Sequence, residues 1–324
     1  MKKSLFKVFS NVQFFRPTKP LDLLENIIKT GNDRFLVNKG FTPCGAHDPH
    51  SEGWVSPVKG GDDLFFASNG HLLLKMRCQD KLLPESVIKD LLFEKVDEIE
   101  AQQNKKLKSK EKAALKEEII TSLLPQAFTK NDDIILWFSP SDNLIGVATA
   151  SATKAEYILS FLRKTLGSLP VVPVQTKTPL RITMTEWLKE GNCQSEKFNL
   201  GGTAELKAAD EESNAIKVKG QDMTSDEITA MLNADKVVTS MALQWVDGDS
   251  GTDFTLTETF GIKGIKYSTE LLASADSDDT SPSAALDAEF YLLAQTLPRF
   301  FNDLITIVGG EQEPKAEEEE QSND

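Results

Sequence analysis

The chain has 324 residues, of which 40% are hydrophobic and 27% are charged, a composition typical of a globular protein rather than a disordered one. Its formal net charge of −14 argues against a uniformly nucleic-acid-binding surface, because phosphates repel acidic surfaces. No apolar run reaches the roughly 18 residues that a membrane-spanning helix needs, so we expect no membrane association.

The cysteines indicate a reducing compartment. Cys44, Cys78 and Cys193 are odd in number, lie far apart and form no CxxC pair. This pattern favours free thiols over a disulfide framework. The N-terminal residues also lack the apolar core of a secretory signal, because polar residues interrupt each apolar run. We therefore expect a cytoplasmic protein.

The first 80 residues predict short elements. The pattern of residues 5–15 is typical of a strand, and residues 21–29 predict a short helix that Gly31 ends. Residues 63–67 and 71–77 read as two strands joined through Asn69-Gly70. Asn-Gly supports the positive φ angles of a type I′ turn, so the pair predicts a β-hairpin.

Residues 81–130 form a long glycine-free segment bounded by Pro84 and Pro125. An apolar stripe at helical spacing predicts a first amphipathic helix, on Ile88, Leu92, Val96 and Ile99. We expect Ser109 to cap a second helix. The buried face of that helix is predicted to hold Leu115, Ile119 and Leu123. Together the two predict an antiparallel helical hairpin.

Lysines gather at the centre of this hairpin. Between residues 105 and 116 they outnumber acids six to one, a local charge of +5: Lys105, Lys106, Lys108, Lys110, Lys112 and Lys116. The cluster has no aromatic residue for base stacking and no arginine–amide pattern for reading base edges. Lysines alone indicate phosphate contact, and hence duplex DNA binding without sequence preference. A solvated helical face is the alternative.

Further hairpins and helices follow the basic segment. Residues 133–139 and 144–149 predict a hairpin, and Thr153 with Glu156 predicts a capping box for a helix that Gly167 ends. The prolines of LGSLPVVPV favour an edge or irregular strand.

In the last third, Thr224 and Glu227 predict a second capping box, for a helix to about Leu232. Strands are expected at residues 236–245, 252–258 and 262–267. A final helix at 284–307 is expected to break at Pro298. Hairpins interleaved with helices predict an α+β fold.

The pattern divides the chain into four parts. We expect a discontinuous central α+β domain (1–80 and 131–185), the helical hairpin (81–130) and a second α+β domain (186–310). The remaining residues, 311–324, carry a net charge of −6, so the rest of the chain accounts for the other −8. Such a run predicts a disordered acidic tail.

Two metal-site interpretations are weaker. Cys44, His47 and His50 have the spacing C-x2-H-x2-H, but structural zinc normally needs four ligands and no second pair lies nearby. The acids at 62–63 and 276–279 resemble a two-metal nuclease site. Solvated loops explain both clusters more simply. Phosphate-cradling glycine motifs and nucleophile motifs are also missing from the sequence, so we expect no metal, no cofactor and no catalytic residues.

Nine short motifs, in the same order along nearly the whole chain, resemble the family of the recombination-associated protein RdgC of bacteria. They are FTPCG (41–45), GWV (53–55), LP…VIK (83–89), SLLPQAF (122–128), LRKTLGSLPVVP (162–173), TEW (185–187), AELK (204–207), QDMTSDEI (221–228) and KVVT (236–239).

The resemblance implies a ring-shaped α+β homodimer that encircles duplex DNA without sequence specificity. It implies a nucleoid-associated protein that restrains RecA-promoted strand exchange. It also implies a positive inner surface of the ring, on which we expect the lysines to lie. Descriptions of the family also carry an exonuclease label, so a metal-dependent exonuclease acting on DNA is the alternative function.

Two positions carry over from the family, and a third departs from it. Phe128 matches a phenylalanine at the subunit interface, with an ordinary core aromatic as the alternative. Gln221 matches a glutamine that the family uses toward DNA beside a lysine. Here the preceding residue is Gly220, so Lys219 or Lys217 is expected to replace that lysine.

Overall fold

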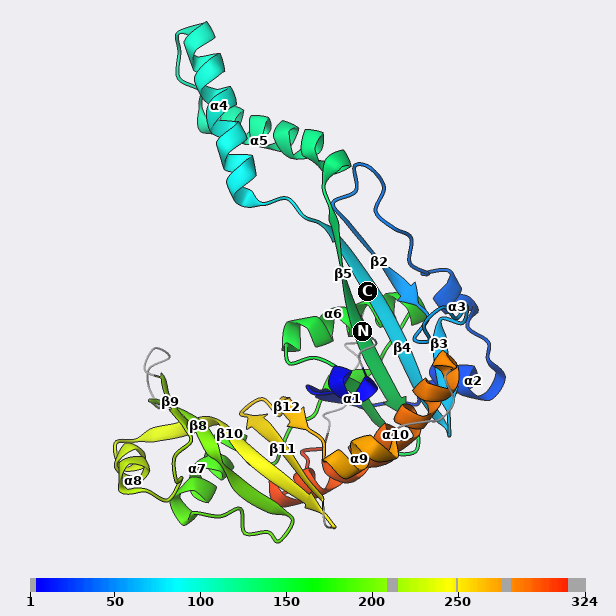
Figure 1. Ribbon diagram of the computed structural model, residues 1–324, viewed down its shortest axis with the longest axis vertical. Coiled ribbons are helices and arrows are strands. Elements are labelled where there is room, and N and C mark those ends of the chain that lie inside the picture. Colours follow the sequence, from blue (N-terminus) through cyan, green and yellow to red (C-terminus); the bar gives the residue numbers. More distant parts are fainter. Residues whose placement is uncertain (1–3, 209–214, 249, 276–280, 314–324) are drawn as a thin grey trace, which may run out of the picture.

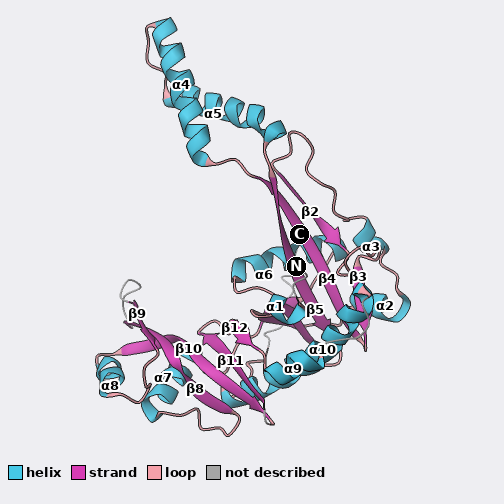
Figure 2. Cartoon of the chain, viewed as in Figure 1, coloured by secondary structure: helices cyan, strands magenta, loops and turns pink. Residues whose placement is uncertain are grey.

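The computed structural model describes residues 4–208, 215–248, 250–275 and 281–313. In this part of the chain ten α-helices accompany two sheets, and every strand pair in both sheets is antiparallel (Figures 1 and 2). The predicted α+β class is therefore confirmed. The predicted acidic tail lies outside the described residues from 314 onward.

The larger sheet has seven strands in the order β2-β4-β5-β6-β1-β7, with β3 also paired to β4. Its strands are β1 (Gln13–Pro17), β2 (His50–Val55), β3 (Phe65–Ser68), β4 (His71–Lys81), β5 (Thr129–Ser139), β6 (Leu144–Val147) and β7 (Val171–Pro173). The proline-rich β7 lies at the sheet edge, as predicted, where a missing N–H disrupts no ladder.

Both faces of this sheet are buried. Leu72, Leu74 and Met76 of β4 pack in a core with α2 (Asp22–Thr30), α3 (Arg34–Val37) and α6 (Ala152–Leu166). Leu73 points to the opposite face, because side chains alternate along a strand. There it joins a second core with α1 (Leu5–Val8) and α10 (Pro282–Ile307).

The smaller sheet has five strands in the order β12-β11-β10-β8-β9. They are β8 (Phe198–Ala208), β9 (Ala215–Lys219), β10 (Lys236–Asp247), β11 (Ser250–Thr257) and β12 (Ile262–Lys266). The buried residues of α7 (Leu180–Glu190) and α8 (Asp226–Asn233) share one core with this sheet and with α10, and α9 (Thr269–Ser274) precedes α10. One continuous core therefore joins the two sheets.

Several local predictions are confirmed. Asn69 and Gly70 have φ angles of 51° and 82°, as a type I′ turn requires, and they join β3 to β4. The helix expected at 21–29 is α2, and Gly31 ends it with a φ of 70°. The hairpin expected at 133–139 and 144–149 is β5–β6, although β5 begins earlier, at Thr129.

The prediction for residues 5–15 is wrong in its first half. Residues 5–8 form helix α1, whose Leu5 and Phe6 are buried in the core shared with α10, and the strand begins only at Gln13. Residues 5–8 form a single short helical turn that is buried against another helix. A segment of this length has too little periodicity to distinguish a helix from a strand.

Both predicted capping boxes are wrong in position. Ser151, not Thr153, caps α6, and its hydroxyl accepts from the N–H of Lys154 at 3.3 Å. Ser225 precedes α8, while the hydroxyl of Thr224 donates to Asp222 at 2.7 Å. Neighbouring Ser and Thr residues are equivalent cap candidates in sequence, and tertiary packing decides between them.

The expected break at Pro298 is also absent from α10, which continues through this proline to Ile307. Phe300, Phe301 and Leu304 follow the proline and are buried. Packing of this apolar face compensates for the hydrogen bond that a proline cannot donate.

In Figure 1 the chain forms an open arc, with a helical hairpin at one end, the five-stranded sheet at the other and the seven-stranded sheet between them. Val12 and Ile262 exchange two backbone hydrogen bonds, of 2.9 and 3.0 Å, between the two sheets. Among the helices of the described residues, none is both long and apolar enough to cross a bilayer.

Candidate nucleic-acid interface

The helical hairpin consists of α4 (Glu85–Gln103) and α5 (Ser109–Leu123), and it connects β4 to β5. A short 3-10 turn (Leu124–Gln126) leads from α5 back to β5. Lys81 pairs with Thr129, and the N–H of Leu82 donates to the carbonyl of Phe128 at 2.7 Å. The hairpin therefore stands on a paired β-ribbon and projects from the arc (Figure 1).

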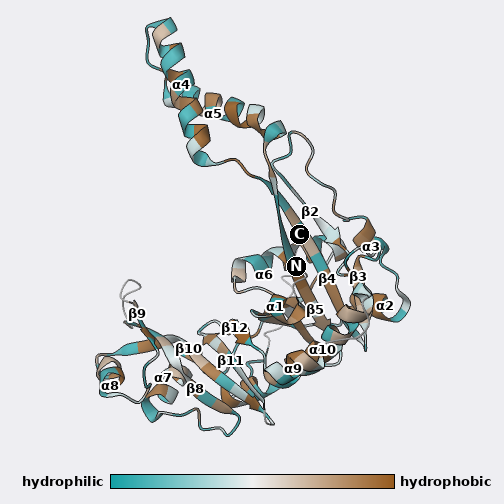
Figure 3. Cartoon of the chain, viewed as in Figure 1, coloured by the Kyte–Doolittle hydropathy of each residue, from teal (hydrophilic) through white to brown (hydrophobic). Residues whose placement is uncertain are grey.

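The hairpin has a narrow core. Ile88, Val96 and Ile119 are buried between the helices, and the other predicted stripe residues are half-buried: Leu92, Ile99, Leu115 and Leu123. The predicted amphipathic helices are confirmed. Most of the exposed residues of both helices are polar, and Figure 3 shows hydrophilic and hydrophobic colours mixed along α4 and α5.

Glu100 organises the tip of the hairpin. Helix α4 ends at Asn104, which adopts a left-handed φ of 50°. The Glu100 carboxylate then accepts from the N–H of Leu107 at 2.8 Å and pairs with Lys112 at 3.2 Å. The Leu107 N–H, followed by Lys112, lowers the pKa of Glu100, so this carboxylate stays ionised.

Ser109 does not cap α5, contrary to the prediction. It is the first helical residue, and Lys108 occupies the cap position. The Glu111 carboxylate accepts from the backbone N–H of Lys108 at 2.6 Å. An acid at the third helical position thus satisfies one free donor without a capping hydroxyl.

The six clustered lysines differ in their surroundings. Lys105, Lys106 and Lys108 are exposed in the connection between the helices, and Lys110 is exposed at the start of α5. Lys112 faces α4, where it is paired with Glu100, and Lys116 is half-buried one turn further on. Within the described residues the other five lysines have no ion-pair partner, so the tip presents uncompensated positive charge.

Phe128 lies at the base of the hairpin, and its side chain is 84% exposed. It lines a groove of about 230 Å³ together with Leu82, Pro84, Val87 and Leu123. Leu82 and Val87 are also exposed, as is Phe93 on α4. The alternative of an ordinary core aromatic is therefore wrong for Phe128. Sequence analysis missed the other three, although Phe93 falls outside the apolar stripe of its helix and so was a candidate for exposure.

Lys219 and Gln221 lie at the opposite end of the arc. Lys219 ends β9, the edge strand of the smaller sheet, and both side chains are exposed. Gly220 turns the chain with a φ of 65°, and its N–H donates to Gly202 at 2.6 Å. Lys217 is paired with Glu205 at 3.2 Å, whereas Lys219, beside Gln221, has no ion-pair partner among the described residues.

The two predicted contact regions are not brought together within one chain. Figure 1 shows the hairpin and β9 at the two ends of the arc, and both ends curve toward the same open side. A single long ligand on that side, rather than one compact site, is therefore the geometry that reaches both.

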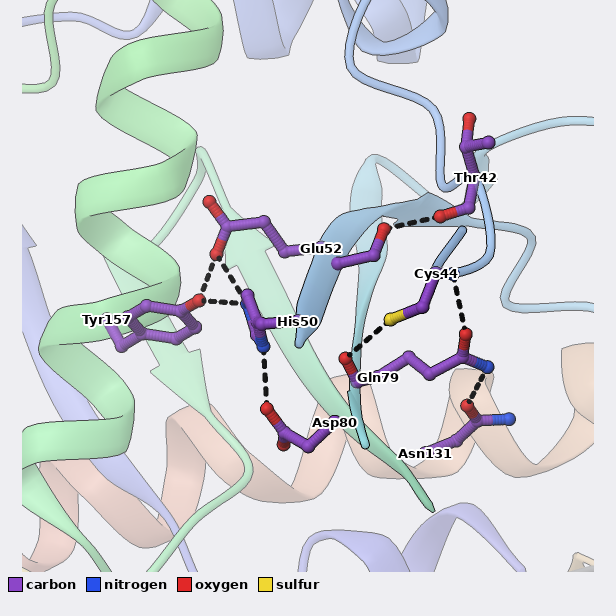
Figure 4. A network of polar contacts seen from close by, with 9 residues as sticks. Thr42, Cys44, His50, Glu52, Gln79, Asp80, Asn131 and Tyr157 are labelled. Atoms are coloured by element: carbon purple, nitrogen blue, oxygen red, sulfur yellow. Dashed lines mark hydrogen bonds and ion pairs between the residues drawn. The ribbon is translucent and has the colours of Figure 1, made fainter. Parts of the chain in front are cut away.

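The residues of the zinc alternative face different partners (Figure 4). The Cys44 thiol contacts the Gln79 carbonyl at 3.3 Å, whereas His50 Nδ1 lies 2.7 Å from Asp80 and His47 is exposed. The described residues hold no group of three or more histidine, cysteine or acidic side chains arranged to bind a metal. Asp276 to Asp279, the acids of the two-metal alternative, lie outside the described residues.

The fold and this surface define an α+β protein with a basic helical projection and an apolar groove at its base. A family model described as "Putative exonuclease, RdgC" matches residues 8–311. The chain belongs to this family, as the resemblance of its motifs indicated.

Its relatives include three proteins named recombination-associated protein RdgC. The one from Aeromonas hydrophila is 44% identical over 94% of this chain and 99% of its own length. Those from Tolumonas auensis and Edwardsiella ictaluri are 41% and 40% identical, again over 94% of this chain and over 99% and 98% of their own lengths.

Proposed function

We propose that this protein binds duplex DNA without sequence preference and that the tip of the α4–α5 hairpin makes the main phosphate contacts. The observation that carries the proposal is a set of five lysines that have no ion-pair partner within the described residues, four of them exposed at one projecting tip, within an acidic chain. Phosphate neutralisation by lysine releases counterions whatever the base sequence, so such a tip gives affinity but no base readout.

The acidic remainder of the chain is compatible with this function. Charges separated by more than a Debye length, about 8 Å at physiological salt, are largely screened from one another. The tip projects away from the two sheets, so a phosphate at the tip encounters mainly the local lysines. Two acids beside them are already engaged: Glu100 by Lys112 and the N–H of Leu107, and Glu111 by the N–H of Lys108.

The proposal includes a homodimeric ring. An 84% exposed phenylalanine beside an apolar groove is a self-complementary pair of features, because each copy offers a protruding ring and a receiving groove. Two arcs joined through these features enclose a space lined by hairpin lysines and by Lys219. Enclosure slows dissociation from DNA, so each subunit needs only a local positive lining.

The role that follows is obstruction. A ring that coats duplex DNA keeps RecA from the same duplex and so restrains RecA-dependent homologous recombination in the nucleoid. This antagonism rests on the family resemblance and on the recombination-associated names of the relatives. It requires no direct contact with RecA.

The test compares linear duplex with covalently closed circular duplex of the same sequence, across a salt titration, with the oligomeric state measured by sedimentation. We expect binding as a dimer, a steep loss of affinity with salt, and slower loading onto closed circles than onto linear DNA. A salt-independent affinity would refute the phosphate mechanism. Equal loading onto both topologies by a monomer would refute the ring.

The family description also names a putative exonuclease, which is the second candidate. End-labelled duplex incubated with the protein and Mg²⁺ or Mn²⁺ separates the two candidates. A DNA-coating protein leaves the label on full-length strands, whereas an exonuclease shortens them progressively with time and enzyme concentration.

A further inference from the structure

A cavity of about 750 Å³ lies on the face of the seven-stranded sheet opposite α6, and none of its lining residues belongs to the hairpin. Its walls come from α1, the loop after β2, the strands β4 and β5 and the start of α10. Lys75 and Ile135, which are register partners on β4 and β5, line it from the sheet. Its volume lies in the range of small-molecule sites, which are roughly 300–1,000 Å³.

Three lysines line the cavity, and none of them has an ion-pair partner in the described part of the chain. Lys7 comes from α1, Lys59 from the loop after β2 and Lys75 from the centre of the sheet. Lys75 is half-buried, and this burial lowers its pKa, an effect that Asp133 partly opposes. A half-buried ammonium group without a carboxylate partner is costly unless a bound anion or water compensates it.

The acids around the cavity are already engaged. Asp133 accepts two hydrogen bonds from Arg77, at 2.7 and 2.8 Å, and Asp132 pairs with Lys154 at 2.5 Å. Glu289 of α10 accepts from the backbone N–H of Leu5. Asp132 and Asp133 are therefore neutralised by cations, whereas Glu289 bonds only a neutral N–H, so in the described residues the three ammonium groups outnumber the one carboxylate of the lining without a cation partner.

One part of the wall is apolar, from residues that lie on three elements and include Leu5, Val8, Ile135 and Leu286, and Ser10 and Asn11 add polar groups beside it. Asn131 also lines the cavity, and its side-chain oxygen accepts from Gln79 at 2.8 Å. Phosphate alone needs neither the apolar wall nor this volume. A ligand with a flat, largely apolar body and one phosphate group uses both.

We propose that this cavity binds a nucleoside monophosphate, with the phosphate held by Lys75, Lys59 and Lys7 and the base against the apolar wall. The ligand is either a free nucleotide or the phosphorylated terminal nucleotide of a DNA strand, since both present the same chemistry. The site is separate from the hairpin tip. It therefore adds a second, nucleotide-sized site to a chain whose proposed duplex contact lies mainly at that tip.

Isothermal titration calorimetry on the full-length protein tests this proposal, with dAMP, deoxyadenosine and inorganic phosphate as probes. We expect dAMP to bind once per chain, and each of the other two to bind at least about tenfold more weakly, because each forms only part of the contacts. Absence of dAMP binding at millimolar concentration overturns the proposal. Equal affinity for inorganic phosphate and dAMP overturns the nucleotide assignment.

Lys75→Met removes the buried charge and keeps an unbranched side chain, and it should weaken dAMP binding about tenfold or more. Lys59→Met should also weaken dAMP binding, and because Lys59 is exposed this substitution does not put the fold at risk. Lys189→Met, at an exposed position of α7, is the control and should leave binding unchanged. dAMP binding that neither Lys75→Met nor Lys59→Met weakens refutes the site.

A short single strand with and without a 5′ phosphate identifies the source of the ligand. Binding that depends on both the 5′ phosphate and Lys75 assigns the site to DNA ends, and binding of dAMP alone assigns it to free nucleotides. Duplex affinity of Lys75→Met measured on closed circles should equal that of the unmodified protein, since the hairpin lysines are intact. A failure of the proposed duplex binding is therefore distinguishable from a failure of this site.

Discussion

Replacement of two tip lysines tests the proposed DNA contact most directly. Lys105 and Lys108 are exposed, lie in the connection between α4 and α5, and have no ion-pair partner in the described residues. The double variant Lys105→Gln with Lys108→Gln therefore removes phosphate contacts without breaking an internal ion pair. We expect its free energy of unfolding to change by no more than about 0.5 kcal/mol, as for ordinary surface substitutions.

The expected effect on DNA binding is a change in salt dependence. Each lost phosphate contact reduces the slope of log K against log salt concentration by about 0.9 on duplex DNA. Two contacts per chain correspond to a reduction of about 1.8, and two hairpins in a dimer to about 3.6. Fluorescence anisotropy with labelled duplexes of several unrelated sequences, each titrated over a range of salt, measures this slope.

The matched control is Lys39→Gln with Lys164→Gln, which removes the same charge after α3 and near the end of α6, far from the hairpin (Figure 1), from two exposed lysines that have no ion-pair partner in the described residues. We expect the control to retain nearly the full slope. An unchanged slope in the tip variant would refute phosphate contact at the tip. Loss confined to one duplex sequence would instead indicate base readout, which lysines on this surface do not predict.

Three further outcomes follow from exposure and burial. Phe128→Ala should shift the proposed dimer toward monomer in sedimentation at micromolar concentration while leaving the far-ultraviolet circular dichroism spectrum unchanged, because the phenyl ring is 84% exposed; a persistent dimer argues against this interface. At pH 8 a thiol reagent should modify Cys44 first, because burial raises the pKa of Cys78 to about 11 and of Cys193 to about 12 and keeps both protonated; three equally fast thiols would contradict the fold. Leu206→Ala, at a fully buried site, should lower the free energy of unfolding by about 2–5 kcal/mol in urea titration, and a change below about 1 kcal/mol would contradict its core position.

Local signals in the sequence predicted much of the fold. Asn69-Gly70 specifies its turn through backbone sterics alone, and the stripe from Ile88 to Ile99 specifies a helix through periodicity alone. The predictions of helix-capping residues failed where several candidates were adjacent in the sequence, because packing decides between them. The position of β1 between β6 and β7 was outside the reach of the sequence, since no local pattern encodes which distant strands pair.

The candidate interface was likewise predictable from the sequence only in part. The lysine cluster was visible in composition, and its exposure follows from its place between two amphipathic helices. The exposure of Phe128 and the groove beside it depend on how α5 returns to β5, so only the structure shows them. The family resemblance supplied a role for Phe128, and the structure supplied the protruding side chain and the groove on which that role depends.

Glu100, an acid of α4, has two structural roles at the lysine-rich tip. Lysines at adjacent turns repel one another and destabilise a helix slightly, and a tight connection also leaves backbone donors without partners. One carboxylate addresses both problems, because it accepts from Leu107 and neutralises Lys112. Lys112 therefore stabilises the hairpin, and the other five lysines remain available for the proposed phosphate contacts. Within one cluster, structural charge and proposed ligand-binding charge are carried by different lysines.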